Sequence, residues 1–143
     1  MARIKLTPPD HFSFSTTIPV RITDINYGNH LGNDAVLSIL HEARMQYLIS
    51  LGYTELAFAG IGLIMSDVAI EFKLEAFYGD TLKAYVTTGE INKVGFDIYY
   101  KLERCSNNAV VALAKTGMVC FHYDTRKVVA VPEEAVKKMS SQL

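Results

Sequence analysis

A short stretch near the N-terminus gathers several side chains that can take part in catalysis. Residues 21–34 read Arg-Ile-Thr-Asp-Ile-Asn-Tyr-Gly-Asn-His-Leu-Gly-Asn-Asp. An acid, amides and an imidazole stand there among glycines, which suits a site where the backbone approaches a polar ligand and a proton moves. The same residue types also build ordinary turns and helix caps, so composition alone leaves both interpretations open.

Three side chains are candidates for proton transfer. Histidine titrates near neutral pH, so His30 is either a general base, or a group that holds a carbonyl, or a structural loop residue. Gly28 beside it lets backbone N–H groups approach a developing oxyanion. Asp24 is either a turn acid that accepts from nearby amides or a catalytic acid. Glu42 lies roughly 120° around the expected helix from its packed face, where it either pairs with Arg44 or reaches the loop or a partner subunit.

The neighbouring sequence predicts the elements that position these groups. Apolar and polar residues alternate over 12–22, which predicts a first strand, and Pro19 places that strand at an edge or a bulge. From 33 to 51 the apolar residues follow helical spacing, with Asn33 as the N-cap and Gly52 as the C-terminal stop. This helix is apolar around so much of its circumference that we expect other structure to wrap it.

The rest of the chain predicts an antiparallel meander. Segments rich in Val, Ile, Phe, Tyr or Thr are separated by short turn signals, and a final short strand and a terminal helix follow. A buried helix cradled by a curved antiparallel sheet satisfies all these faces, so we expect an α+β fold. The predicted segments are strands at 63–72, 81–91, 96–103, 110–123 and 127–131, and a helix at 133–139.

Composition limits the class of protein. At 143 residues we expect one domain, 1–143, with roughly two-thirds of its unfolded surface buried. The formal net charge of −1 argues against nucleic acid and anionic membranes as partners.

The longest run without charge, 56–66, falls well short of the ~20 residues that insertion into a bilayer needs. No secretion signal follows Arg3 and Lys5, so we expect a cytoplasmic protein. Cys105 and Cys120 are expected to be reduced core thiols, with no metal site.

The order of residues around the loop resembles the hotdog-fold acyl-CoA thioesterases, in particular the 4-hydroxybenzoyl-CoA thioesterase branch. That branch reads, roughly, Arg-x-x-Asp-x-Asp-x-x-Gly-His-x-Asn-Asn, followed by a helix that carries Glu-Ala-Arg. The resemblance extends over about 12–132 and implies a hotdog fold, in which a curved antiparallel β-sheet wraps a long central helix. The matching positions are Arg21, Asp24, His30, Asn33, Glu42, Ala43, Arg44, Phe72, Ala76, Gly79, Asp80 and Leu82.

The resemblance also implies a reaction, the hydrolysis of an acyl-CoA or acyl-ACP thioester. His30, with Asp24 or Glu42, would activate a water. The chain departs from the family at Asn26, which replaces the second acid of the Asp-x-Asp pair. Asparagine cannot take a proton, so Asn26 would face the reacting carbonyl and orient a water.

Other residues are expected to bind the substrate. Gly28, Asn29 and Asn33 would contact the thioester through the loop and the positive end of the helix. Gly28 stands where plant acyl-ACP thioesterases carry an asparagine. Lys93 and Arg126 lie in predicted turns and are candidates for the phosphates of coenzyme A. We expect no cofactor other than the coenzyme A of the substrate.

Two alternative functions remain open. A hydroxyacyl thioester dehydratase pairs a loop histidine with a helix acid, as His30 and Glu42 do here, but no proline lies between Pro19 and Pro132, where dehydratases carry a Pro-rich loop. A non-catalytic acyl-thioester binding protein is favoured by Asn26. Release of free thiol separates this binder from both enzymes.

The sequence also predicts an oligomer. The expected sheet carries apolar residues on its second face and edges, which one helix cannot cover. The resemblance implies a homodimer that joins edge strands into one sheet, or a dimer of dimers.

Overall fold

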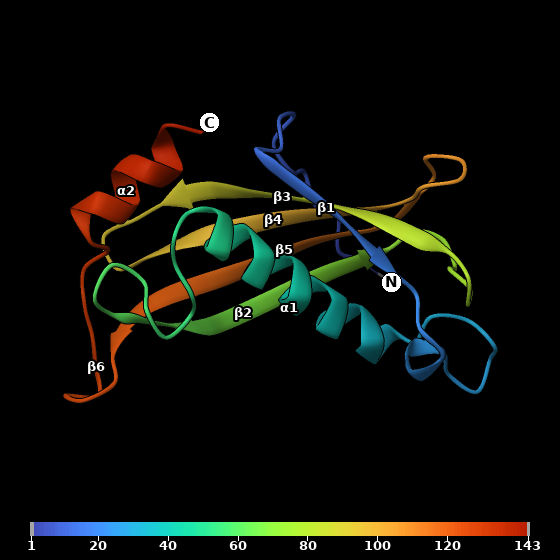
Figure 1. Ribbon diagram of the computed structural model, residues 1–143, viewed down its shortest axis with the longest axis horizontal. Helices are drawn as coiled ribbons and strands as arrows, with labels where there is room; N and C mark the ends of the chain where they lie inside the picture. The colour runs from blue at the N-terminus through green and yellow to red at the C-terminus, as the bar shows by residue number, and fades with distance from the viewer. Residues whose placement is uncertain (1, 143) are drawn as a thin grey trace.

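The computed structural model describes residues 2–142 and consists of an antiparallel sheet with a long helix on one face (Figure 1). In the sheet the strands run in the order β1-β3-β4-β5-β2, and β6 pairs with β5. The predicted α+β arrangement is confirmed. The elements are β1 (Phe14–Pro19), the 3₁₀ helix η1 (Ile22–Asp24), α1 (Asn33–Ser50), β2 (Gly62–Phe72), β3 (Thr81–Ile91), β4 (Gly95–Arg104), β5 (Val110–His122), β6 (Lys127–Val128) and α2 (Glu133–Ser140).

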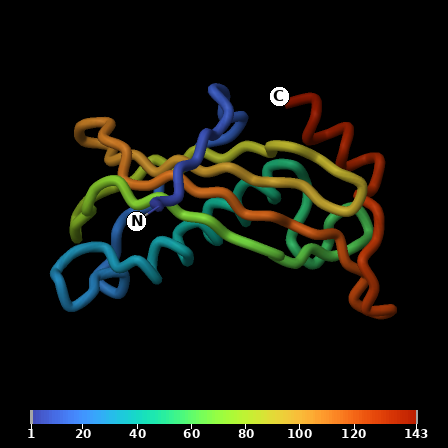
Figure 2. Tube along the Cα trace, turned by 180° about the vertical axis from the view of Figure 1, so that it is seen from behind, coloured from blue at the N-terminus to red at the C-terminus, as the bar shows by residue number. Residues whose placement is uncertain are grey.

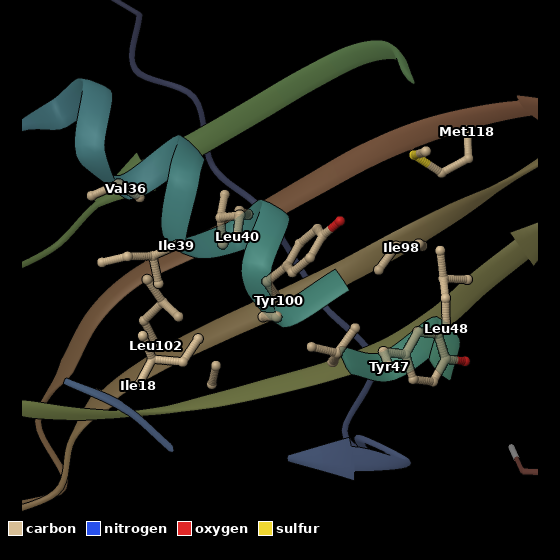
Figure 3. Close-up of a cluster of buried hydrophobic side chains, with 14 of the residues drawn as sticks. Ile18, Val36, Ile39, Leu40, Tyr47, Leu48, Ile98, Tyr100, Leu102 and Met118 are labelled. Atoms are coloured by element: carbon tan, nitrogen blue, oxygen red, sulfur yellow. The ribbon is translucent and has the colours of Figure 1, made fainter. Parts of the chain in front are cut away.

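The helix α1 supplies much of the core. Leu40, Ala43 and Leu48 have no exposed surface, and Val36 is nearly as buried. Figure 3 shows Leu40 and its neighbours lying between the helix and the strands, against buried side chains of the sheet. Because this apolar side runs along the whole helix, burying it against the sheet fixes the direction of α1. Within residues 2–142 no helix is both long and apolar enough to cross a membrane.

The two ends of α1 differ in how well the sequence predicted them. Gly52 follows the last turn with a φ of +87°, so the predicted stop is confirmed. At the other end Gly32, and not Asn33, is the N-cap. A Cβ at position 32 would lie only 2.6 Å from Asp34 Oδ1. A side chain there would require the Asp34 carboxylate to move, and Asn33 is the first helical residue.

The first strand is shorter than predicted. It ends at Pro19, and Val20 N donates to Asp80 O at 2.9 Å as the chain leaves the sheet. The next residues form η1, so Asp24 lies in a 3₁₀ helix and not at the end of a strand. The prediction from Pro19 is confirmed, because β1 lies at one edge of the sheet and a missing N–H is tolerated there.

A small polar network crosses the core below α1. Arg44 is buried and its Nε donates to Glu55 Oε1 at 3.1 Å, while Nη1 donates to the Tyr100 hydroxyl at 3.2 Å. That hydroxyl lies 2.7 Å from Thr116 Oγ1. Burial raises the pKa of Tyr100, so the hydroxyl remains protonated and able to donate. Of the alternatives for Glu42, the pairing with Arg44 is not formed, because Arg44 is bonded to Glu55.

The N-terminal segment covers part of the other face of the sheet. Figure 2, seen from behind, shows this segment crossing the strands. Leu6 N donates to Glu71 Oε1 of β2 at 3.0 Å, and the Phe12 ring lies 5.8 Å from the Tyr85 ring of β3. Lys101 Nζ of β4 lies 5.4 Å from the Phe12 ring centre. The N-terminal segment thus covers part of the second face of the sheet, which the sequence analysis predicted to contact another subunit. Strand β2 is the other edge of the sheet.

Candidate functional site

The loop that leads into α1 is closed by its own backbone. Ile25 and Leu31 form an isolated β-bridge. Asn26 N donates to His30 O at 2.9 Å, and Asn29 N donates to Asn26 O at 3.1 Å. Asn29 adopts a φ of +66°, a left-handed conformation that asparagine tolerates better than most residues. The loop is therefore held in one conformation by internal bonds.

Asn26 and His30 border one small space. Asn26 Oδ1 accepts from Gly28 N at 2.9 Å. A Cβ at Gly28 would lie 3.2 Å from His30 Nε2 and 3.3 Å from Asn26 Oδ1. The absence of a side chain at position 28 thus keeps open the space between the imidazole and the amide. His30 Nε2 and Asn26 Oδ1 thus both face the backbone of Gly28.

The imidazole of His30 is oriented by the next residue. Its Nδ1 lies 3.1 Å from Leu31 O. A carbonyl oxygen only accepts, so Nδ1 carries the hydrogen and Nε2 of the neutral ring keeps its lone pair. That lone pair is on the side of the ring that faces Gly28 and Asn26. His30 is therefore arranged as a proton acceptor.

Asp24 is occupied by contacts of a structural kind. Its carboxylate is buried, with 5% of the residue exposed. Oδ2 accepts from Arg21 N at 2.8 Å, and Oδ1 lies 3.4 Å from Arg21 Nη2. Its backbone oxygen accepts from Gly32 N at 2.9 Å. These contacts match the interpretation of Asp24 as a turn acid that holds the start of the loop.

A cavity of about 180 Å³ lies beside His30. Its polar lining comes from His30, Asn33, Lys73 and Glu75. Asn33 is the first residue of α1, where backbone amides have no partner within the helix and the helix end is positive. The cavity thus combines a proton acceptor, an electropositive helix end and an apolar wall. The apolar residues of the lining are Leu31, Val36, Phe72, Leu74, Ala76 and Val111.

Glu42 does not reach this cavity within one chain. It lies about two and a half turns beyond Asn33, roughly 13 Å along the helix axis. Its side chain is exposed, and Oε2 accepts from Gln46 Nε2 at 2.9 Å. It lines a separate open pocket of about 220 Å³ together with Arg21 and His41.

The turn between β3 and β4, which holds Lys93, and the segment after β5, which holds Arg126, lie at the opposite end of the sheet from the start of α1 (Figure 1). Val111, at the start of β5, lines the His30 cavity. Lys93 lies in the turn before Gly95, which pairs with Val119, roughly 26 Å farther along β5 at the rise of a strand. Arg126 follows the end of the same strand. One chain alone therefore brings together His30, Asn26, Gly28 and Asn33, but not these two cations.

Sequence reasoning missed the wall of the cavity. Phe72 and Ala76 match the family pattern without any sign of a role in binding, and Val111 falls inside a predicted strand. The register of β5 against β4 skips Val111, since Glu103 pairs with Val110 and Leu102 with Ala112. Such a bulge turns an extra side chain inward. The residue types in this segment do not predict the bulge.

The two cysteines lie in different surroundings. Both thiols are free, but only Cys120 is buried, and Cys105 is exposed, so the prediction of two core thiols is wrong for Cys105. Burial raises the pKa of Cys120 to about 11, which keeps that thiol protonated at neutral pH. Across residues 2–142, no three or more His, Cys, Asp or Glu side chains cluster closely enough to hold a metal ion.

Comparison with known proteins identifies the class to which this loop and sheet belong. Residues 20–139 match the family described as the Thioesterase-like superfamily, and the chain belongs to it. No curated protein matches the sequence. The resemblance seen in the sequence is thereby confirmed at the level of the superfamily.

Solved structures show the same fold. The 1,4-dihydroxy-2-naphthoyl-CoA thioesterase Slr0204 from Synechocystis is 22% identical, with a TM-score of 0.80 over 89% of this chain and 95% of that one. A predicted thioesterase from Bacillus stearothermophilus is 20% identical, with a TM-score of 0.81 over 91% and 96%. A thioesterase from Thermus thermophilus, complexed with coenzyme A and Zn, is 16% identical, with a TM-score of 0.80 over 94% and 97%. The predicted hotdog fold is confirmed.

The contacts of Asp24 generate a prediction about stability. Asp24→Ala leaves Arg21 N without its acceptor, so we expect the free energy of unfolding to fall by about 1 kcal/mol, as for loss of a helix cap, measured by urea denaturation. Asp24→Asn keeps an oxygen that can accept the same bond and should retain most of the stability. If Asp24→Asn is as stable as the wild type but loses turnover, Asp24 has a catalytic role that its contacts do not reveal.

Proposed function

We propose that this protein hydrolyses an acyl thioester, with the acyl group in the cavity beside His30. The observation that carries the proposal is the orientation of His30, whose free Nε2 faces the space beside Asn26 while the ring lines an apolar cavity. Thioester hydrolysis needs a proton acceptor next to an apolar slot and a positive group for the oxyanion. Membership of the Thioesterase-like superfamily supports the same reaction.

The reaction begins with a water between His30 and Asn26. His30 Nε2 takes a proton as the water oxygen bonds to the thioester carbonyl carbon, and the amide of Asn26 orients the water or the carbonyl. The C–S bond then breaks, and the imidazolium returns the proton to the leaving sulfur. The products are a free acid and a thiol. Asparagine requires another residue to accept the proton, and His30 is the acceptor that the loop supplies.

The oxyanion is stabilised by the first turn of α1. The amides of Asn26, Asn29, Leu31 and Gly32 already donate to backbone oxygens, and that of Gly28 donates to Asn26 Oδ1. The loop amides expected from the sequence are thus largely occupied. The amides of the first helical residues, beginning at Asn33, remain available, and the positive helix end favours negative charge there.

Coenzyme A is the carrier that we propose. A structural neighbour from Thermus thermophilus is a complex with coenzyme A, which supports this choice over an acyl carrier protein. Gly28, Asn29 and Asn33 would contact the thioester and the start of its carrier. The proposal includes no metal and no cofactor beyond the coenzyme A of the substrate, and we expect the reaction to take place in the cytoplasm.

The other functions that the sequence left open differ in their support. Within one chain Glu42 lies away from His30 and bonds to Gln46, which weighs against a dehydratase. A non-catalytic acyl-thioester binder remains the second candidate, because the side-chain oxygen of Asn26 already accepts a hydrogen bond from Gly28 N. Release of free thiol from an acyl-CoA distinguishes the enzyme from the binder.

The proposed assembly is a homodimer, with a dimer of dimers as the larger alternative. Strand β2 is an edge of the sheet, and its exposed Met65, Val68 and Phe72 lie along it. Pairing β2 with β2 of a second copy makes one continuous sheet and removes both edges. Because that pairing is antiparallel, it brings the far end of the second copy, where Arg126 lies, toward the His30 cavity.

We therefore expect light scattering to give at least the mass of a dimer at micromolar concentration. Val68→Glu places two like charges near the proposed two-fold axis and should shift the protein toward monomer, with lower turnover. Ile49→Glu, at an exposed position on α1 and outside β2, is the control. A well-folded monomer with full turnover would rule out a site shared between subunits.

The role of His30 is tested by removing its side chain. Loss of a general base typically lowers the rate by ~10²–10⁴-fold, and we expect this of His30→Ala with little change in melting temperature. Glu42→Gln is the companion variant, and its turnover should stay near that of the wild type if the cavity beside His30 is the site. Equal turnover in wild type, His30→Ala, Glu42→Gln and Asp24→Asn would contradict the mechanism.

Asn26 is tested by two substitutions. Loss of one oxyanion-type hydrogen bond costs ~10²-fold in rate, so Asn26→Ala should lower thiol release by about that factor. Asn26→Asp restores the acid of the 4-hydroxybenzoyl-CoA branch and keeps an oxygen that can accept from Gly28 N.

The outcomes of the Asn26 variants are distinct. If only Asn26→Asp releases thiol, the natural protein is a binder. If Asn26→Asp is inactive and the wild type is active, a negative charge opposes the oxyanion and the amide is required. Equal rates in all three proteins would show that position 26 does not touch the reaction.

A further inference from the structure

We propose that the cavity selects apolar acyl groups of about six non-hydrogen atoms, and that Val111 sets this limit. The proposal rests on the function proposed above and names the class of substrate for the same site. The depth of the cavity is set by apolar residues at its inner end and not by the residues proposed to carry out the reaction. Two features carry it: the volume of the cavity and the closure of its inner end.

The volume gives the size of the acyl group. The cavity holds about 180 Å³. Apolar cavities of roughly 150 Å³ in other proteins bind benzene, which has about six carbons, so a cavity of this size accepts an apolar group of about six non-hydrogen atoms. A hexanoyl chain or a single ring meets this limit, whereas a dodecanoyl chain exceeds it. Because the deeper wall is apolar, each methylene that fits adds binding energy.

The inner end of the cavity is closed by the core. Val36, Ala76 and Val111 line the cavity and are at most 3% exposed. Farther along α1, Leu40 and Leu102 have no exposed surface and fill the space between helix and sheet (Figure 3). Protein interiors are packed as densely as crystals and have little room to yield. A longer chain therefore cannot continue along the inner side of the helix.

Val111 is held in place by the strand pairing and by backbone hydrogen bonds. It is the extra residue of a β-bulge, since Glu103 pairs with Val110 and Leu102 with Ala112. Its carbonyl accepts from Lys73 N at 2.9 Å and from Leu74 N at 3.2 Å. The bulge turns Val111 inward beside Ala112, and both are buried. Val110, one residue earlier, pairs with Glu103 and lies outside the cavity lining.

Shortening Val111 should lengthen the preferred acyl group. We would measure thiol release from straight-chain acyl-CoAs, acetyl to dodecanoyl, for wild type, Val111→Ala and Val110→Ala. Wild-type kcat/KM should rise about fourfold per added methylene up to hexanoyl and then stop rising. Val111→Ala removes two methyl groups and should move the maximum by about two carbons. Val110→Ala should keep the wild-type profile.

A second variant and a binding measurement complete the test. Ala76→Leu fills the cavity and should move the maximum toward shorter chains, with circular dichroism to check the fold. Calorimetric binding of the same acyl-CoAs to His30→Gln, which lacks the imidazole but keeps a side chain in the cavity lining, reports the cavity without turnover. If no protein releases thiol but the binding profile shifts with Val111→Ala, the function proposed above fails and the size limit holds. A wild-type maximum at dodecanoyl, an unchanged profile in Val111→Ala, or no binding at all would overturn the limit.

Discussion

The candidate site depends on two backbone hydrogen bonds at the start of α1. Leu31 N donates to Ala76 O at 2.8 Å, and Gly32 N donates to Asp24 O at 2.9 Å. The first ties the histidine loop to the segment that lines the cavity, and the second ties it to the 3₁₀ helix that follows β1. Since α1 is fixed by its buried apolar side, these bonds make the loop rigid with respect to the core. His30 and the first helical amides thus keep their relative positions without a ligand, which lowers the cost of reorganisation during a reaction.

Replacing an acid by Asn26 changes the electrostatics of this site. A carboxylate between His30 and the end of α1 would stabilise an imidazolium, but it would also repel a developing oxyanion. The amide does neither, and its oxygen is already held by Gly28 N. The positive end of α1 then supplies most of the stabilisation of the negative charge in the transition state, and His30 accepts the proton. The departure from the family pattern is therefore compatible with catalysis, provided the imidazole alone is a sufficient base.

The sequence predicted the parts of the structure that depend on periodic burial. The helix near 33–51 and the four long strands were recognised because their apolar residues repeat with the geometry of one element. Predictions that depended on which residues come into contact in the folded chain were less successful. Arg44 pairs with Glu55, which lies beyond the end of α1, and the first strand ends at Pro19, before the 3₁₀ helix η1. His30 and Asn26 were recognisable from their types and spacing, whereas Val111 was not, because a bulge depends on the register between two strands.

The site also separates the reacting groups from the groups that limit the substrate. His30 and Asn26 are held by a loop whose bonds are mostly internal, while Val111 is held by β5 and by Lys73 and Leu74. The bond from Leu31 N to Ala76 O connects the two parts. Because Val111 is held by β5 and His30 by its own loop, a substitution at Val111 changes the wall of the cavity without removing a hydrogen bond that holds the imidazole. A fold of this kind can thus keep one mode of hydrolysis while the wall opposite the loop determines which acyl group reaches it.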